Sequence, residues 1–265
     1  MVGGTGRIAA SFARLRAERR LGLIAYLTVG YPRPQLTPDL VEAAVNSGAD
    51  AIELGIPFSD PLADGPTIQA ASQAALKAGV TVSSALEIAR AARAQTAVPL
   101  VFMTYLNPIL AFGLERFCQA ARAAGVDGLI VPDLPAAEAG DLRGAAGSAG
   151  LDLVFFVAPT SRQAGIDAAC EAATGFIYCI AVTGVTGARG QLSPAVVPLI
   201  EAVRQRTALP VVVGFGISRP EHLAALRGKA DGVIVASALL DAIARDPGDP
   251  AARVRHFLEG LRQPV

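Results

Sequence analysis

A repeat of a strand followed by a helix is the feature that most limits the folds open to this chain of 265 residues. From Gly22 onward, a short apolar run, a turn, an alanine-rich amphipathic stretch and a second turn recur eight times. Runs rich in Val, Ile, Leu or Phe are typical of strands buried on both faces of a parallel sheet. We therefore predict eight strands, over residues 22–29, 51–56, 99–105, 128–132, 152–157, 176–182, 210–215 and 232–236.

Eight such units favour a closed sheet over an open one. Right-handed crossovers place the helices outside the strands, so the parallel sheet can close on itself as a barrel. We predict an α/β fold in which residues 1–265 form a single (β/α)8 TIM barrel domain, with a doubly wound open sheet as the alternative. Residues 7–20 carry Ile8, Phe12 and Leu15 at helical spacing, which predicts an extra N-terminal helix that plugs one end of the barrel.

Several turns that lead into a predicted strand repeat one short phrase. Each places glycine or other small residues before the strand, as expected where a helix ends and the chain reverses. The phrases are Ser47-Gly-Ala-Asp-Ala, Ala124-Gly-Val-Asp-Gly, Ala149-Gly-Leu-Asp-Leu and Lys229-Ala-Asp-Gly.

Charge and hydropathy exclude several classes of partner. The chain has 23 basic and 23 acidic residues, and its one short basic cluster, Arg14 to Arg20, alternates with apolar residues, so we expect no nucleic-acid partner. No apolar run reaches the roughly 18 residues that a membrane helix needs, so we expect no membrane partner. The first residues lack the pattern of a secretory signal, so we expect a cytoplasmic protein.

The residues that most often build metal sites or attack carbonyl groups are few and poorly placed. The cysteines lie in apolar patterns and are interpreted as core thiols, and the histidines and lysines lie away from the carboxyl ends of strands. We therefore predict neither a metal site nor a Schiff-base lysine. The residues concerned are Cys118, Cys170, Cys179, His222, His256, Lys77 and Lys229.

An acidic residue interrupts the second predicted strand. Glu53 lies between apolar neighbours, where an unpaired carboxylate costs several kcal/mol. The strand leads directly into a proline-rich loop that contains Asp60 and Asp64, and such loops at the carboxyl ends of strands carry the active sites of barrels. Glu53 is the candidate acid/base, with a structural carboxylate as the alternative.

The two environments predict different protonation states. Desolvation should raise the pKa of Glu53, as suits a group that gives and takes a proton near neutral pH, whereas Asp64 in the wetter loop should remain ionised. Two carboxyl groups in unlike surroundings can divide acid and base roles. A magnesium site formed by Asp60 and Asp64 is the alternative, although the loop lacks regular ligand spacing.

The last two predicted strands end in small residues. Val213-Gly-Phe-Gly-Ile-Ser218 and Val235-Ala-Ser237 can present backbone N–H groups and a helix N-terminus to a phosphate group, and barrels commonly bind phosphate there. The candidate phosphate-binding residues are Gly214, Gly216, Ala236 and Ser237, and a simple tight turn is the alternative. The glycine-rich loop Thr183–Gly190 after the sixth strand suggests a movable lid.

These motifs resemble those of one family, the alpha subunits of tryptophan synthase. The resemblance spans all eight units and rests mainly on Glu53-Leu-Gly-Ile-Pro-Phe-Ser-Asp-Pro-Leu-Ala-Asp-Gly-Pro66. Support comes from Met103-Thr-Tyr-Leu-Asn-Pro108, Asp133-Leu-Pro135, Gly184-Val-Thr-Gly187 and Gly214-Phe-Gly-Ile-Ser218. It implies cleavage of indole-3-glycerol phosphate to indole and glyceraldehyde 3-phosphate, without a cofactor in this subunit.

The resemblance also assigns roles to individual positions. Glu53 resembles the family's general acid/base and Asp64 its second catalytic carboxylate; Tyr178 resembles a substrate-binding residue and Thr186 the lid residue. Positions that match the phosphate site are Gly187, Gly216 and Ser237, and we choose Tyr26, Met103 and Phe215 as the wall for the indole ring. Two positions depart from the common pattern: Ala236 replaces a frequent glycine and Val182 replaces an arginine of some members.

Membership implies a partner, the pyridoxal-phosphate-dependent beta subunit, in an alpha2beta2 assembly. We expect the apolar segment Asn107–Phe112 to form part of that interface, with helix capping and core packing as the alternative. Three other functions stay open on the sequence alone: a lyase that works without a partner, a catalytically silent regulatory barrel, and an isomerase of another sugar phosphate.

Overall fold

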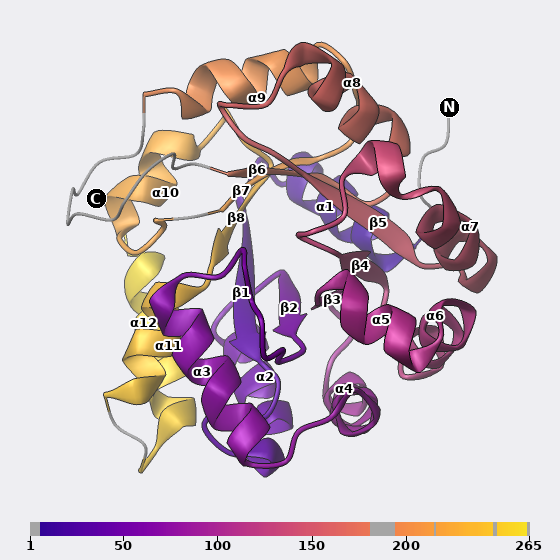
Figure 1. The fold of residues 1–265 in the computed structure, drawn as a ribbon. Coiled ribbons are helices and arrows are strands. Elements are labelled where there is room, and N and C mark those ends of the chain that lie inside the picture. The colour runs from indigo at the N-terminus through magenta and orange to yellow at the C-terminus, as the bar shows by residue number, and fades with distance from the viewer. Residues whose placement is uncertain (1–5, 181–193, 215, 246–247, 264–265) are drawn as a thin grey trace.

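The computed structural model describes residues 6–180, 194–214, 216–245 and 248–263, and these contain a closed barrel of parallel strands. Each strand pairs with its neighbours in sequence order, and β8 closes the barrel on β1 (Figure 1). The strands are β1 (Gly22–Thr28), β2 (Ala51–Gly55), β3 (Leu100–Met103), β4 (Gly128–Ile130), β5 (Asp152–Val157), β6 (Ile177–Ile180), β7 (Val211–Gly214) and β8 (Gly232–Val235). The eight predicted strands and the TIM barrel are confirmed, with ends shorter by up to two residues in the described parts.

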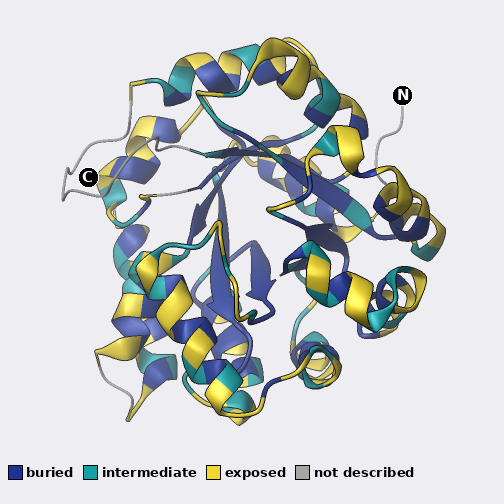
Figure 2. Ribbon diagram, viewed as in Figure 1, coloured by how far each residue is buried: buried dark blue, intermediate teal, exposed yellow. Residues whose placement is uncertain are grey.

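Helices surround the strands and carry the solvent-facing side chains, so the sheet is buried on both faces (Figure 2). Within the described ranges, no helix is long and apolar enough to cross a membrane. The α-helices are α1 (Arg7–Ala17), α2 (Thr37–Asn46), α3 (Pro66–Lys77), α4 (Val82–Gln95), α5 (Leu106–Phe112), α6 (Leu114–Ala123), α7 (Gly140–Ala149), α8 (Gln163–Ala172), α9 (Val196–Arg204), α10 (Pro220–Leu226), α11 (Ser237–Ala244) and α12 (Pro250–Leu261). Short 3-10 turns cover η1 (Pro34–Leu36) and η2 (Ala136–Glu138).

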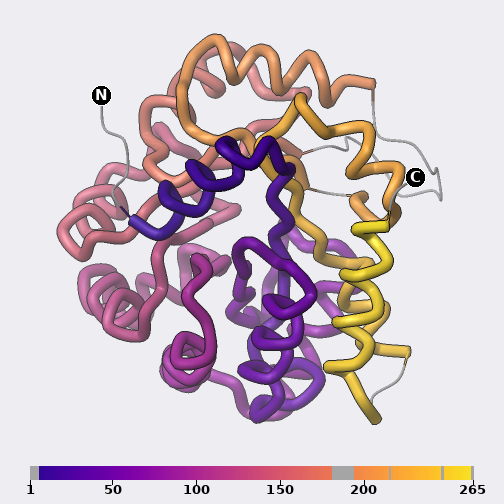
Figure 3. The backbone as a smooth tube through the Cα atoms, turned by 180° about the vertical axis from the view of Figure 1, so that it is seen from behind, coloured from indigo at the N-terminus to yellow at the C-terminus, as the bar shows by residue number. Residues whose placement is uncertain are grey.

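Helix α1 lies across the amino-terminal end of the barrel, as the sequence predicts (Figure 3). Its apolar residues Ile8, Phe12 and Leu15 are all buried. They contact glycines at the beginnings of strands: a Cβ on Gly22 would approach Leu15 to 2.8 Å, and one on Gly128 would approach Ile8 to 3.0 Å. The absence of side chains at these strand starts is therefore what lets the helix close the barrel.

The repeated turn phrases have a structural role that the sequence did not reveal. Asp50, Asp127 and Asp231 are each nearly inaccessible, and each binds the first residues of the strand before it by two hydrogen bonds. Asp127, for example, accepts the Leu100 N–H at 3.0 Å through its carboxylate and donates its own N–H to the Leu100 carbonyl at 2.8 Å. These aspartates therefore fix the register of neighbouring strands at the amino-terminal end of the barrel.

Arginines from the outer layer compensate the buried charges. Arg93 of α4, itself largely buried, approaches Asp127 to 3.2 Å, and Arg7 of α1 approaches it to 2.9 Å. Asp231 forms salt bridges with Arg16 of α1 at 3.0 Å and with Arg204 of α9 at 3.1 Å. The charges at this end of the barrel thus join the plug, the outer helices and the strand starts into one network.

We expect Asp127→Ala to lower the free energy of unfolding by about 2–4 kcal/mol, because it leaves the buried Leu100 N–H without its acceptor and the largely buried Arg93 without its carboxylate partner. Urea denaturation measures the change. The exposed Asp39→Ala is the control and should stay within about 0.5 kcal/mol of the wild type. Equal effects of the two substitutions would contradict a structural role for Asp127.

Candidate active site

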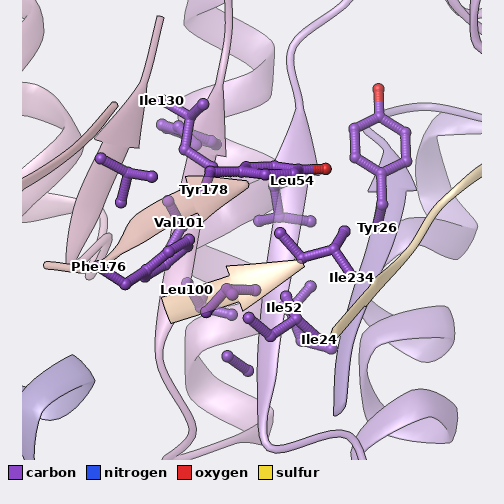
Figure 4. Close-up of a cluster of buried hydrophobic side chains, with 14 of the residues drawn as sticks. Ile24, Tyr26, Ile52, Leu54, Leu100, Val101, Ile130, Phe176, Tyr178 and Ile234 are labelled. Carbon is purple, nitrogen blue, oxygen red and sulfur yellow. The ribbon is translucent and has the colours of Figure 1, made fainter. Parts of the chain in front are cut away.

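The opposite end of the barrel, at the carboxyl ends of the strands, brings together several predicted site residues. Strand register places Tyr26 of β1 level with Glu53 of β2, and Glu53 level with Val101 of β3. Because residues at matched positions of parallel strands face the same side, these three line the interior together. Tyr178 of β6 enters the same space, and its hydroxyl points toward Tyr26 (Figure 4).

Glu53 is the buried acid that the sequence predicts. The residue is 1% exposed, and its Oε2 atom has no hydrogen-bond partner among the described residues. Burial, and secondarily the nearby Asp64 charge, raises the pKa of Glu53 to about 8. The side chain is therefore protonated at neutral pH and can serve as a proton donor.

Asp64 lies in the loop between β2 and α3, partly buried over the strand end. Desolvation raises its pKa to about 6, while a hydrogen bond from the Tyr105 hydroxyl opposes that rise. The two carboxyl groups thus titrate on either side of neutral pH, and Asp64 is the ionised one there. The predicted division between a protonated Glu53 and an ionised Asp64 agrees with this order.

Tyr105, at the end of β3, holds the acidic loop and was missed by the sequence interpretation. Its hydroxyl accepts the Ala63 N–H at 3.0 Å and hydrogen-bonds the Asp64 carboxylate. Its ring packs against Phe58, with centroids 5.4 Å apart. Burial and the Asp64 charge raise the pKa of Tyr105, so the phenol stays protonated and remains a donor.

Two tyrosines lie across glycines of the neighbouring strands. A Cβ on Gly55 would come within 2.0 Å of the Tyr26 hydroxyl, and one on Gly214 within 2.2 Å of the Tyr178 hydroxyl. Thr28 also donates to the Tyr26 hydroxyl at 3.4 Å. Tyr26, predicted as part of an apolar wall, thus brings a polar group into the interior. The inner face of Gly214, predicted to bind phosphate, is occupied by the Tyr178 ring.

The wall of the interior includes one aromatic ring that the sequence interpretation missed. Phe156 of β5 is level with Tyr178, and the two ring centroids are 4.5 Å apart. Alternation along the strand was the available signal, since it places Phe156 on the inner side with Val154. Met103, predicted for the same wall, is partly exposed at the end of β3, level with Ile130.

The described part of the predicted phosphate cradle lies at the ends of β7 and β8. Gly216 has a φ of +78°, which favours glycine, and Ser237 is the first residue of α11, directly after Ala236. Helix α11 therefore begins at the barrel mouth and directs its amino-terminal end there. The other predicted site residues, Thr186, Gly187 and Phe215, and the departure at Val182 fall outside the described residues.

The other residues considered for chemistry lie elsewhere. Asp60 is exposed and accepts a hydrogen bond from Ser59, and the described residues contain no group of three or more potential metal ligands that includes it. His222 accepts the Ser218 N–H on α10, and Lys229 bonds the Ala225 carbonyl. Cys118 and Cys179 are buried free thiols, as predicted, and Cys170 is partly buried.

We expect the stability of the wild type to fall relative to Glu53→Gln as pH rises from 5 to 8. A glutamate in the unfolded chain loses its proton near 4.5, whereas Glu53 in the folded protein keeps it to about 8. Between these values the unfolded state binds fewer protons, so ionisation favours unfolding by up to about 1.4 kcal/mol per pH unit. Glutamine cannot ionise, so the free energy of unfolding of Glu53→Gln lacks this dependence on pH.

Urea denaturation of both proteins at pH 5, 6.5 and 8 measures the difference. The exposed Glu87→Gln on α4 is the matched control, and its difference from the wild type should not change with pH in this way. A difference between Glu53→Gln and the wild type that stays constant over this range would show that Glu53 ionises normally.

Comparison with known proteins identifies close relatives. The family described as "Tryptophan synthase alpha chain" matches residues 12–263. The tryptophan synthase alpha chain of Chloroflexus aurantiacus is 50% identical over 97% of this chain and 99% of its own length, and that of Geobacter sulfurreducens is 44% identical over 98% of each. Among solved structures, Mycobacterium tuberculosis tryptophan synthase aligns with a TM-score of 0.89 at 39% identity, over 97% of this chain and 96% of that chain. The alpha subunit from Legionella pneumophila aligns with a TM-score of 0.87 at 36% identity, over 98% of both chains.

Proposed function

The chain belongs to the family of tryptophan synthase alpha chains, and from this premise we propose how its residues perform the reaction. The family cleaves indole-3-glycerol phosphate in tryptophan biosynthesis, so the chain is a carbon–carbon lyase. The observation that carries the proposal is the pairing of a buried, protonated Glu53 with a more acidic Asp64 at the mouth of the barrel.

Glu53 is the proposed acid and base of the retro-aldol cleavage. It first gives its proton to C3 of the indole ring, which turns the ring into a cation that can act as a leaving group. The resulting Glu53 carboxylate then takes the proton from the side-chain hydroxyl next to the ring. The carbon–carbon bond breaks, its electron pair restores the indole, and the hydroxyl carbon becomes the aldehyde of glyceraldehyde 3-phosphate. Glu53 ends with its proton restored.

Asp64 is the proposed partner of the indole nitrogen. Protonation at C3 makes the ring N–H more acidic and positive, and an ionised carboxylate stabilises that charge through a hydrogen bond. The Tyr105 hydroxyl and the Ala63 N–H hold the loop that carries Asp64, so the acceptor needs little rearrangement when the cation forms. A fixed, partly desolvated acceptor contributes more than one that water surrounds.

The remaining interior residues are proposed to bind the two ends of the substrate. We assign Tyr26, Met103 and Phe156 to the walls that contact the flat ring, and Tyr178 has its hydroxyl near Glu53. The phosphate group is assigned to Gly216, Ala236 and Ser237 with the amino-terminal end of α11. Thr186, Gly187 and Phe215 keep their proposed roles, whereas we assign Gly214 to accommodating Tyr178.

The family relationship also implies partnership with the beta subunit, and we propose an alpha2beta2 assembly. Among the described residues, two large apolar side chains are exposed: Leu62 of the acidic loop at 91% and Leu110 of α5 at 55%. Within the predicted interface segment, Ile109 is buried and Phe112 is partly covered, so Leu110 is the large apolar side chain left exposed. A beta subunit seated on both side chains would cover the loop that carries Leu62 and Asp64 as well as the outer face of α5.

The proposed steps are proton transfers and one carbon–carbon cleavage, which residues of this chain can carry out. The proposal therefore assigns no cofactor to this subunit and leaves pyridoxal phosphate to the beta subunit, which would consume the released indole. The proposed setting is the cytoplasm, and the proposed catalytic unit is the single barrel formed by residues 1–265, with its active site at the carboxyl ends of the strands.

We expect Glu53→Gln and Asp64→Asn each to reduce indole release from indole-3-glycerol phosphate by roughly 10²- to 10⁴-fold, because each removes one proton-transfer or charge-stabilising group. The purified chain is assayed with and without a tryptophan synthase beta subunit. The exposed Glu87→Gln serves as the control and should keep wild-type activity.

Each outcome of this assay selects among the candidate functions. Activity that rises with the beta subunit and is lost in Glu53→Gln supports the proposed enzyme. Indole release that does not change when the beta subunit is added favours a lyase that works alone. Wild-type activity in either carboxyl variant would reject the proposed mechanism, and no indole under any condition would leave the silent barrel or another sugar phosphate.

The pH dependence of kcat/KM tests the proposed protonation states. Activity should fall below a pH of about 6 as Asp64 gains a proton, and above about 8 as Glu53 loses one, which gives a bell-shaped profile. Steady-state assays from pH 5 to 9.5 measure both limbs. A profile that rises through pH 9 without a basic limb would contradict a protonated Glu53 as the donor.

A further inference from the structure

The loop after β4 contacts the start of α5, which belongs to the preceding β/α unit. Asp133 lies in this loop, and its Oδ1 atom accepts the backbone N–H of Leu106 at 2.9 Å. Leu106 is the first residue of α5, so this contact fixes where the helix leaves β3. The mechanism proposed above gives no role to Asp133, although the Asp133-Leu-Pro135 motif is part of what marks the sequence.

The residue directly before Leu106 is Tyr105, which holds the acidic loop. Its backbone is extended, with φ of −84° and ψ of 160°, and its side chain is nearly inaccessible. Since its hydroxyl binds both the Ala63 N–H and the Asp64 carboxylate, a shift of its backbone would move the groups that hold Asp64. The backbone of Tyr105 is thus held between β3, which ends two residues before it, and Leu106, whose N–H binds Asp133.

We propose that Asp133 is a positioning residue for Asp64, acting through the first turn of α5 and the Tyr105 hydroxyl. The inference rests on the proposed role of Asp64. It extends the reaction centre to a third β/α unit. Asp133 of the β4 loop accepts the Leu106 N–H, Leu106 follows Tyr105 in the chain, and the Tyr105 hydroxyl binds the β2 loop at Ala63 and Asp64.

The electrostatics favour the same arrangement. Charges on Asp64 and, more weakly, Asp133 add to desolvation in raising the pKa of Tyr105, which keeps its hydroxyl as a donor. The other titratable groups near Asp64 are Glu53 on β2, Tyr26 on β1 and Tyr178 on β6. All three stay neutral near pH 6, and the Tyr105 hydrogen bond is the side-chain interaction that lowers the pKa of Asp64, so we assign the effect of Asp133 on the Asp64 titration to this bond.

The test compares Asp133→Ala with Asp133→Asn in the full chain, using indole release from indole-3-glycerol phosphate. Alanine removes the acceptor of the Leu106 N–H, and we expect kcat/KM to fall about 2- to 30-fold, as for the loss of a helix-terminal acceptor. A weakened Tyr105 bond should also move the acid limb of the pH profile upward, because that bond lowers the pKa of Asp64. Asparagine keeps an Oδ1 acceptor and should restore most of both properties.

A double-mutant cycle separates positioning from a general effect on folding. In a Tyr105→Phe background, Asp133→Ala should cause little further loss, because the hydroxyl through which it acts is already absent. Asp141→Ala, in the first turn of α7, is the control for removal of an exposed aspartate and should leave activity and the pH profile unchanged. Thermal unfolding of every variant shows that the compared proteins are folded.

The outcomes distinguish failure of the positioning role of Asp133 from failure of the proposed mechanism. Full activity of Asp133→Ala, an unmoved acid limb, or an equal loss in the wild-type and Tyr105→Phe backgrounds would overturn the positioning role while Asp64→Asn remains inactive. If Asp64→Asn itself kept wild-type activity, the proposed mechanism would fail and the inference with it. Loss in Asp133→Ala that Asn reverses, and that disappears without the Tyr105 hydroxyl, would support the inference.

Discussion

Burial of one carboxyl group inside a closed sheet is the constraint on which the candidate site depends. Closing the barrel removes water from the position of Glu53, and the described surroundings offer its Oε2 atom no replacement partner. The neutral, protonated form of Glu53 then has a lower free energy than the buried carboxylate. The nearby Asp64 stays charged because its loop reaches solvent and receives the Tyr105 hydrogen bond. The same closure that stabilises the fold therefore separates the two carboxyl groups into an acid and an anion.

The two ends of the barrel treat carboxylates in opposite ways. At the amino-terminal end, Asp50, Asp127 and Asp231 have backbone donors and arginines around them, and they join strands to helices. At the carboxyl end, the Glu53 Oε2 atom has no hydrogen-bond partner among the described residues. Carboxylates with donors and arginines around them hold the architecture together, whereas the buried, protonated carboxyl group of Glu53 retains the capacity to react.

The eight strands, the N-terminal helix and Glu53 were predictable, because continuous apolar runs, the charged residue that interrupts one of them and helix periodicity are local properties of the sequence. Contacts between distant segments were not predictable in the same way. The turn aspartates repeat visibly, but their acceptor role depends on N–H groups of a strand about 20 to 27 residues earlier. Tyr105 was hidden because its hydroxyl crosses from β3 to the β2 loop, and the function of Gly214 became clear only once Tyr178 was seen to lie over it.

The packing of Tyr26 on Gly55 and of Tyr178 on Gly214 limits which substitutions this pocket can accept, in evolution or in the laboratory. Positions 26 and 55 share one volume, and positions 178 and 214 share another, so neither glycine can acquire a side chain unless its tyrosine shrinks or moves. Variation at these sites should therefore arrive in compensating pairs, each crossing from one strand to the next. A library that randomises one glycine at a time would contain mostly variants whose new side chain clashes with the tyrosine. A library that varies each pair jointly would reach new cavity shapes.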